Sequence, residues 1–262
     1  MDAITSTNDN KSSTMTNVYH REDSNAFATK VGKKIKGWYD NNTLHENAIR
    51  RIVLQREEIY ALMEKVKKVS VKKLLKYLDS SGFFYRPSSA NRHHNYPGGL
   101  AEHSLATFRI VDEWNKMTPD ERRKSELFTR FLSDKQFDCD ILTEKANEDD
   151  IVIAALCHDL CKAKHYYIDG RNIKGHNSDP EPRRMHSRLS VKRLEENGIS
   201  QKKCEELLLA VLTHMRLYSK LRNEKEAKNQ KKGRSSMLAI VVWAADKLDA
   251  SRHPAGKRHH EF

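Results

Sequence analysis

AALCHDLCK, residues 154–162, is the most informative stretch of this sequence. It continues an apolar run that starts at Ile151, contains the pair His158–Asp159 and closes on Lys162. A carboxylate and an imidazole are costly to bury together in an apolar helix, so this pair needs a partner such as a cation. The stretch therefore predicts a buried helix that ends in residues able to hold a metal ion.

Helix signals extend on both sides of this stretch. Apolar positions recur at helical spacing after Glu46, Thr118 precedes a proline that suits the first helical position, and Asn147 precedes three acidic residues that suit a helix N-terminus. Asp169–Gly170 marks a small β-hairpin at residues 166–174. Besides the helix that carries the His-Asp pair, we expect helices at residues 46–68, 71–78, 100–117, 119–132, 185–196, 201–217 and 236–251. The sequence predicts an all-helical domain from about residue 45 to residue 255.

The composition limits the class of protein. A chain of 262 residues is long enough for one domain with appendages or at most two, and its nine Tyr and eight Phe argue against disorder throughout. The longest apolar run, Met237–Ala245, is shorter than the roughly 18 residues that a membrane span requires. Because no secretory signal follows Met1, we expect a cytoplasmic protein that does not enter a membrane. The four cysteines lack zinc-ribbon spacing.

Positive charge is concentrated in two stretches of the chain. The 48 Lys and Arg residues exceed the 36 Asp and Glu residues, which gives a formal net charge of +12. Residues 30–77 carry 13 basic and 5 acidic residues, and residues 216–234 carry 8 and 2. A solvated helix face or a surface loop is the alternative explanation for such runs. The second stretch lies between His214 and Asp246 and favours an anionic partner such as a nucleotide or a nucleic acid.

Five motifs, in order along the chain, carry a resemblance to a known family. They centre on His103 in GGLAEHSL, His158–Asp159 in LCHDLCK, His186 in RMHSRLSV, His214 in LTHMRLY and Asp246 in AADKLDA. This pattern resembles the HD superfamily of metal-dependent phosphohydrolases over roughly residues 90–252. The resemblance implies an all-α fold, the HD-domain helical bundle, in which ligands project inward from separate helices.

The resemblance also implies a division of the chain. We expect a disordered tail at residues 1–25, because this segment is rich in Ser, Thr, Asn and Asp without periodicity. A basic helical N-terminal extension would cover residues 26–82, the HD phosphohydrolase domain residues 83–255 and a C-terminal tail residues 256–262. The oligomeric state is open.

The resemblance implies a ligand set for two divalent transition-metal ions. His103, His158, Asp159 and Asp246 would hold the first ion. Asp159 would bridge to a second ion bound by His186 and His214. Imidazole and carboxylate ligands suit Mn, Fe, Ni, Co or Zn, and the sequence does not choose among them.

By the same resemblance, Asp159 and Lys162 are the candidate catalytic residues. Lys162 follows the pair by one helical turn, so its ammonium group would reach a phosphate oxygen. A solvated lysine at a helix end is the alternative. Asp249, one turn after Asp246, is expected to orient a ligand or cap the helix rather than bind metal.

Substrate contacts are expected around the ligands. His94 and Arg92 lie in the loop before His103 and are candidate phosphate or base contacts, with hydrogen bonds that stabilise the loop as an equal alternative. Three further candidates flank proposed ligands, where a guanidinium group binds phosphate with two hydrogen bonds: Arg184, Arg188 and Arg216.

Three readings of the function remain. The leading one is a two-metal phosphohydrolase that cleaves a phosphoester of a nucleotide or a nucleic acid. The second is a di-iron oxygenase, because inositol-oxygenase-like relatives use the same six ligands. The third is a nucleic-acid-binding module in which the HD site is incidental. His214 is followed by Met215 and by no GYP motif, which argues against cyclic-dinucleotide hydrolysis, and no oligonucleotide-binding barrel precedes the domain.

Overall fold

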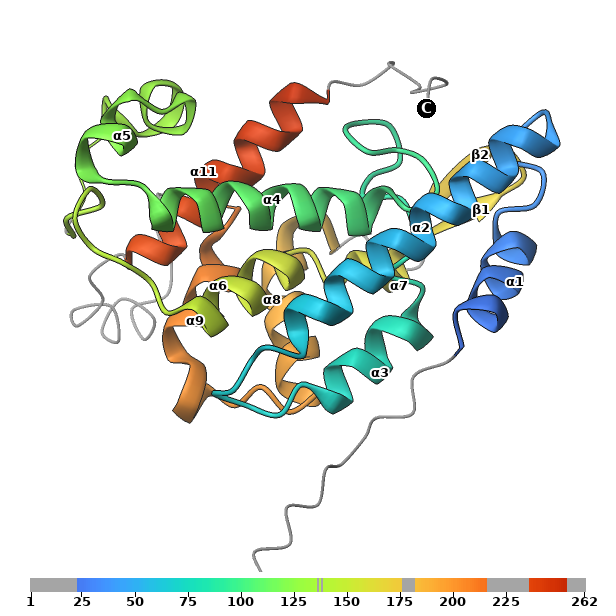
Figure 1. The fold of residues 1–262 in the computed structure, drawn as a ribbon, viewed down its shortest axis with the longest axis horizontal. Coiled ribbons are helices and arrows are strands. Elements are labelled where there is room, and N and C mark those ends of the chain that lie inside the picture. The colour runs from blue at the N-terminus through green and yellow to red at the C-terminus, as the bar shows by residue number, and fades with distance from the viewer. Residues whose placement is uncertain (1–22, 136, 138, 176–181, 216–235, 254–262) are drawn as a thin grey trace, which may run out of the picture.

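A computed structural model gives the arrangement of the helices (Figure 1). It describes residues 23–135, 137, 139–175, 182–215 and 236–253, with the side chains of residues 182–184 left aside. In these ranges the regular structure is helical apart from one two-stranded antiparallel sheet, so the all-α prediction is confirmed. The helices are α1 (Ser24–Lys34), α2 (Asn42–Met63), α3 (Lys72–Ser81), α4 (Gly99–Lys116), α5 (Pro119–Lys124), the π-helical turn η1 (Phe128–Leu132), α6 (Glu148–Cys157), α7 (Lys162–His165), α8 (Pro182–Glu196), α9 (Gln201–Thr213) and α11 (Met237–Arg252).

The bundle centres on α4, α6, α9 and α11, which pack against one another. In Figure 1, α4 runs across the middle of the molecule, with α6 and α9 below it and α11 crossing beside it. The run Met237–Val242 is buried on every side, as expected of a helix that is apolar all round. Ser236 caps this helix by accepting a hydrogen bond from the backbone N–H of Ala239. Helix α8 packs on α9 and completes the wall around the candidate site.

The N-terminal extension is helical and shares its core with the bundle. Helix α1 lies along α2 (Figure 1), and α2 in turn packs on α4 and α6. The guanidinium group of Arg56 on α2 donates two hydrogen bonds to the carboxylate of Asp79 on α3, at 2.8 and 3.0 Å. Both side chains are buried, and Phe27 of α1 covers the guanidinium. The charged pair therefore ties α2 to α3 within the extension, and the contacts of α2 with α4 and α6 join the extension to the bundle.

One helix begins slightly earlier than the sequence predicts. Asp23 accepts hydrogen bonds from the N–H groups of Asn25 and Ala26, which starts α1 at Ser24, inside the segment expected to be a disordered tail. Residues 1–22 of that tail and the C-terminal tail 256–262 lie outside the described residues. The boundary expected between the extension and the HD domain, at residues 82 and 83, stays a prediction.

The single helix predicted at residues 119–132 is wrong. The capping box of Thr118 and Glu121 does form at its start. The helix ends at Lys124, however, because Ser125 is extended and its hydroxyl donates to the carbonyl of Arg122 and accepts from the N–H of Phe128. Such a side-chain bond competes with the helical backbone bond. Residues 128–132 then continue as the π-helical turn η1.

The remaining elements agree with the expected order. The hairpin forms from β1 (Tyr166–Asp169) and β2 (Asn172–Gly175), with Asp169 paired to Asn172 beside the turn. Helix α9 ends at Thr213, and the end expected at Leu217 lies outside the described residues. Among the described helices, none combines the length and the apolar character that crossing a bilayer requires.

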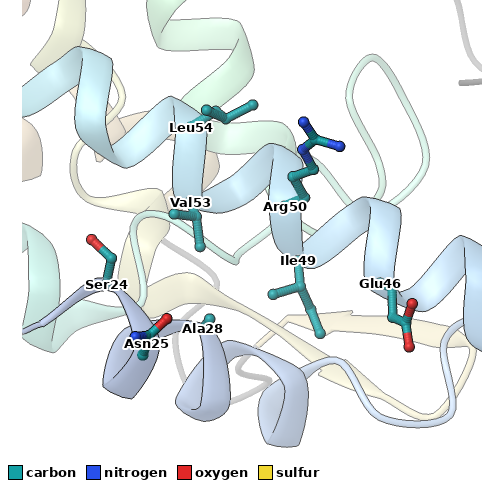
Figure 2. Close-up of a pocket in the computed structure, with 8 residues that line it drawn as sticks. All are labelled: Ser24, Asn25, Ala28, Glu46, Ile49, Arg50, Val53 and Leu54. Atoms are coloured by element: carbon teal, nitrogen blue, oxygen red, sulfur yellow. The ribbon is translucent and has the colours of Figure 1, made fainter.

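A surface pocket of about 270 Å³ lies between α1 and α2 (Figure 2). Its wall is mostly apolar, with Ile49, Val53 and Leu54 on the α2 side and Ala28 on the α1 side. None of the candidate metal ligands lines it. This pocket is therefore separate from the candidate metal ligands.

Candidate metal centre

All six residues that the resemblance nominates as ligands lie together inside the bundle. Each is buried, with at most 8% of its surface exposed. They come from different elements: His103 from α4, His158 and Asp159 from the turn after α6, His186 from α8, His214 from the residue after α9, and Asp246 from α11. Segments that are distant in sequence therefore converge on one place, as in other metal sites built in helical bundles.

Four of these side chains form a first cluster. The Nε2 atoms of His103 and His158 lie 3.0 Å apart. Oδ1 of Asp246 lies 3.2 Å from Nε2 of His103. Oδ2 of Asp159 lies 3.6 Å from Nε2 of His103 and 3.5 Å from Nε2 of His158. Two ring nitrogens and two carboxylate oxygens thus face a common point.

Hydrogen bonds on the far side of each ring fix which nitrogen faces this point. Nδ1 of His158 lies 2.9 Å from the carbonyl oxygen of Ala155, which only accepts, so Nδ1 carries the proton. Nδ1 of His103 donates in the same way to the carboxylate of Asp249, at 2.6 Å. In the neutral tautomers, the two Nε2 lone pairs therefore point at each other across 3.0 Å. A cation between them removes that repulsion, and imidazoles oriented by a second hydrogen bond are the usual metal ligands.

The charges of the first cluster also call for a cation. Burial by itself would raise the pKa of Asp159, but Lys162 and His158 hold it well below its ordinary value. For His103, burial lowers the pKa, and the carboxylates of Asp159, Asp246 and Asp249 outweigh it and raise the pKa well above its ordinary value. The carboxylates of Asp159, Asp246 and Asp249 thus surround His103 and favour a positive charge at this place, which a divalent ion would supply.

A second cluster lies on the other side of Asp159. Its Oδ1 atom is 3.6 Å from Nε2 of His186 and 3.5 Å from Nε2 of His214. Within the described part of the chain, none of these three buried atoms has a hydrogen-bond partner. Nδ1 of His214 donates to the carbonyl of Val211 at 2.6 Å, so its Nε2 carries a lone pair. Burial lowers the pKa of His186 to about 4, which keeps that ring neutral.

Both clusters therefore fit metal ions. Each unpartnered buried polar group costs about 1–3 kcal/mol, and a metal ion among Asp159, His186 and His214 would satisfy all three at once. Asp159 faces the first cluster with Oδ2 and the second with Oδ1, which is the arrangement of a bridging carboxylate.

Lys162 lies against the bridging carboxylate. The pair His158–Asp159 sits in a tight turn rather than in a regular helix, yet Nζ of Lys162 is 2.5 Å from Oδ2 of Asp159. Only 16% of its side-chain surface is exposed, so it is not a solvated lysine at a helix end. Burial lowers its pKa, but Asp159 outweighs this and raises it. Lys162 thus holds a positive charge beside both clusters.

The structure supports the other candidate substrate contacts less directly. Nε2 of His94 donates to Asp249 at 2.8 Å, and its Nδ1 lies 2.8 Å from the hydroxyl of Tyr96. Because both nitrogens of this buried ring are engaged, the arrangement favours the loop-stabilising role over a phosphate contact. Arg92 and Arg188 are exposed, and a substrate contact by either stays a prediction. The side chain of Arg184 and the whole of Arg216 lie outside the described residues.

His93 is a residue that the sequence did not single out. Its ring centroid lies 4.9 Å from that of His103, and one of its ring nitrogens groups with ligand atoms of His103 and Asp246 within 4.8 Å. The only available signal was the dipeptide His93–His94 itself. Two successive histidines do not reveal which of them faces a site.

Comparison with known proteins agrees with this geometry. A family model described as the HD domain matches residues 100–251, which is more than half of the chain and includes all six ligand candidates. Neither a curated protein nor a solved structure matched the chain. The motifs occur in order, their side chains converge on two adjoining clusters, and the family model matches the same residues. This chain therefore belongs to the HD-domain family.

Proposed function

We propose that this protein is a two-metal phosphohydrolase that cleaves a phosphoester of a nucleotide or a nucleic acid. The HD domain is the domain of a superfamily of metal-dependent phosphohydrolases. The observation that carries the two-metal part is the set of buried atoms without partners, Oδ1 of Asp159 and the Nε2 atoms of His186 and His214, beside the first cluster.

The ligand roles follow from the two clusters. His103, His158, Asp159 and Asp246 would hold one ion, and Asp159, His186 and His214 the other. When bound, such a pair of ions lowers the pKa of a water molecule and neutralises charge on the attacked phosphoryl group. Asp159 would contribute one oxygen to each ion, because its two oxygens face different clusters.

Lys162 supplies the remaining positive charge of the site. Its ammonium group is mostly buried and stays protonated. A preorganised cation of this kind stabilises the charge that develops on a phosphoryl group without reorganising solvent. We assign Lys162 to a non-bridging phosphate oxygen and Asp159 to the ions.

The substrate class rests on charge. Residues 30–77 and residues 216–234 both carry a strong basic excess. Basic stretches near a hydrolytic site concentrate polyanions and favour a nucleotide or a nucleic acid over a small neutral ester. The 216–234 stretch lies outside the described residues, so its place relative to the ions is part of the proposal.

Metal analysis combined with a hydrolysis screen tests this function. The full chain, loaded with Mn(II) or Fe(II), should hold two ions and hydrolyse at least one member of a panel of nucleotides, cyclic dinucleotides and oligonucleotides. Asp159→Asn should lose both the second ion and the activity. Asp134→Asn is the matched control, because Asp134 is an exposed carboxylate with 75% of its side-chain surface accessible.

Metal loading should also stabilise the fold. An ion present at about 100 times its Kd adds about 2.7 kcal/mol to the free energy of unfolding. Wild type and Asp134→Asn should therefore melt at a higher temperature with Mn(II) than with chelator, and Asp159→Asn should respond much less. A chain without bound metal and without hydrolysis would contradict the proposal. Substrate-dependent oxygen uptake would instead support the di-iron oxygenase, and nucleic-acid binding that survives in Asp159→Asn without any hydrolysis would support the binding module.

A further inference from the structure

His93 lies at the edge of the first cluster with an unsatisfied nitrogen. Its Nε2 atom is buried and forms no hydrogen bond within the described residues. Its ring packs on that of His103, with 4.9 Å between centroids and 48° between the ring planes. A buried nitrogen without a partner is costly, so this one requires an explanation.

The surroundings of His93 are those of a ligand. One ring nitrogen lies within 4.8 Å of ligand atoms of both His103 and Asp246. The ligand atoms of Asp159, His186 and His214 also lie within 4.8 Å of one another. A neutral imidazole carries a lone pair on one ring nitrogen, and the buried Nε2 of His93, without a hydrogen-bond partner among the described residues, can offer that lone pair to a cation.

The backbone of the loop holds His93 in this position. His94 adopts a positive φ of 49°, which is uncommon for a residue other than glycine. The carbonyl of His94 accepts a hydrogen bond from the N–H of Ser88, and the carbonyl of His93 accepts one from the hydroxyl of Ser89. The rings of His93 and His94 consequently stand at 86° to each other. One ring meets Asp249, and the other meets the first cluster.

The loop also has little room to move. A Cβ atom on Gly99 would lie 2.1 Å from the carbonyl oxygen of His94, so the start of α4 and the loop are in direct backbone contact. Side chains held this firmly are suited to metal coordination, which requires ligands at fixed positions.

We propose that His93 is an additional protein ligand of the first metal ion. The inference rests on the proposed two-metal function. The first ion would then have five protein ligands, namely His93, His103, His158, Asp159 and Asp246, whereas the second would have three. A site that is nearly filled by protein ligands holds its ion tightly, and a site with open positions admits water or substrate. The first ion is therefore the permanent one, and the second is where the substrate binds.

Titration with Mn(II) alone tests this assignment on the full chain. Equilibrium dialysis with elemental analysis should give two ions of unequal affinity in wild type. His93→Ala should weaken the tighter ion at least 10-fold and leave the other within about twofold. His186→Ala should do the reverse. His93→Asp should retain most of the affinity for the tighter ion, because a carboxylate is also a ligand for such ions.

Orthophosphate binding to the Mn(II)-loaded protein distinguishes two roles for His93, that of a metal ligand and that of a residue that contacts the substrate. If His93→Ala holds both ions as wild type does, His93 is not a ligand and the inference is overturned. Weakened phosphate binding in that variant would then identify an anion contact instead. Because His93→Asp brings a negative charge, it should weaken phosphate binding strongly only in that second case.

A measurement on the unmodified chain covers the case in which His93→Ala does not fold. With one equivalent of Mn(II), pulsed EPR should detect three coupled imidazole nitrogens in wild type, from His93, His103 and His158. Two nitrogens would overturn the inference. A wild-type chain that binds no Mn(II) at all would overturn the proposed two-metal function together with it. If wild type binds two ions and His93→Ala binds both with unchanged affinity, only the role of His93 is overturned.

Discussion

The Oδ2 atom of Asp249 lies 2.6 Å from Nδ1 of His103 and so determines which nitrogen of that ring faces the metal centre. The same oxygen accepts a hydrogen bond from Nε2 of His94 at 2.8 Å. Burial would raise the pKa of Asp249, but the two imidazoles hold it well below its ordinary value, so the carboxylate stays ionised. One buried carboxylate thus orients a candidate metal ligand and anchors the loop that carries His93.

Asp249→Ala should therefore weaken metal binding without removing a ligand. His103 would lose the hydrogen bond that fixes its ring, and outer partners of this kind contribute about 10- to 100-fold in metal affinity. Mn(II) affinity from equilibrium dialysis is the measurement, with Asp134→Ala as the exposed-carboxylate control. An affinity within twofold of wild type would mean that packing alone orients the ring.

The buried pair of Arg56 and Asp79 should contribute strongly to stability. Asp79→Ala removes both acceptors of the guanidinium, and the hydroxyl of Tyr60 loses its acceptor at 2.5 Å as well. Leaving a buried charge without its partner costs about 3–5 kcal/mol. Urea unfolding followed by circular dichroism measures the loss.

The double variant Arg56→Met, Asp79→Leu is the informative comparison for this pair. Well-packed apolar residues often replace a buried ion pair with little loss of stability. The double variant should therefore be more stable than Asp79→Ala. If Asp79→Ala costs less than about 1 kcal/mol, water reaches the guanidinium and the pair is not truly buried.

Arg122 should be far less replaceable than its neighbour Arg123. The buried Arg122 donates to the carbonyls of Trp114 and Asn115 at the end of α4 and to three carbonyls of the following loop, those of Ile141, Leu142 and Glu144. Arg122→Ala leaves several buried acceptors without a donor, at about 1–3 kcal/mol each before relaxation. Arg123→Ala is the matched control, because its side chain is 57% exposed and pairs only with Asp120 among the described residues. Arg123→Ala should change the free energy of unfolding by less than about 0.5 kcal/mol, and equal losses in the two variants would contradict the assignment.

Neutralising the basic stretch 216–234 should affect polyanions selectively. Replacing Lys225, Lys228, Lys231 and Lys232 with Gln should weaken oligonucleotide binding and reduce its salt dependence, by up to about 2.8 in the slope of log K against log salt for single strands. Hydrolysis of a mononucleotide should change little. The control neutralises Lys124, Lys145, Lys202 and Lys203, which are exposed and lie outside both basic stretches. Unchanged salt dependence of oligonucleotide binding in the first variant would mean that this stretch is surface charge without a role in binding.

Much of the site was predictable because its ligands occur within recognisable local motifs. His158 and Asp159 end an apolar helix, and the four other ligands each stand in a helical segment that the periodicity identified. The prediction failed at one helix end, where a serine side chain competes with the backbone hydrogen bonds. Ser125 stops a helix that the capping box of Thr118 had correctly started, because its hydroxyl bonds to two backbone groups of the chain around it.

The role of each residue in the site was harder to predict than which residues belong to the site. For His94 the sequence left a substrate contact and loop-stabilising hydrogen bonds as equal alternatives, and in the structure both of its nitrogens are engaged by Asp249 and Tyr96. His93, which no sequence signal favoured, has a buried Nε2 without a hydrogen-bond partner among the described residues. The distinction depends on the positive φ of His94, a single backbone angle that the sequence HH does not encode by itself.

The sequence alone determined the helical fold, the family and the six metal-ligand candidates, because helical periodicity and short motifs are local properties of the chain. Only the tertiary structure decided that Oδ1 and Oδ2 of Asp159 face different clusters and that Asp249 orients His103. The physical reason is that these are contacts between helices far apart in the chain: 146 positions separate His103 from Asp249. Side-chain orientation at such contacts is set by how α4 and α11 pack, and that packing is a property of the whole core.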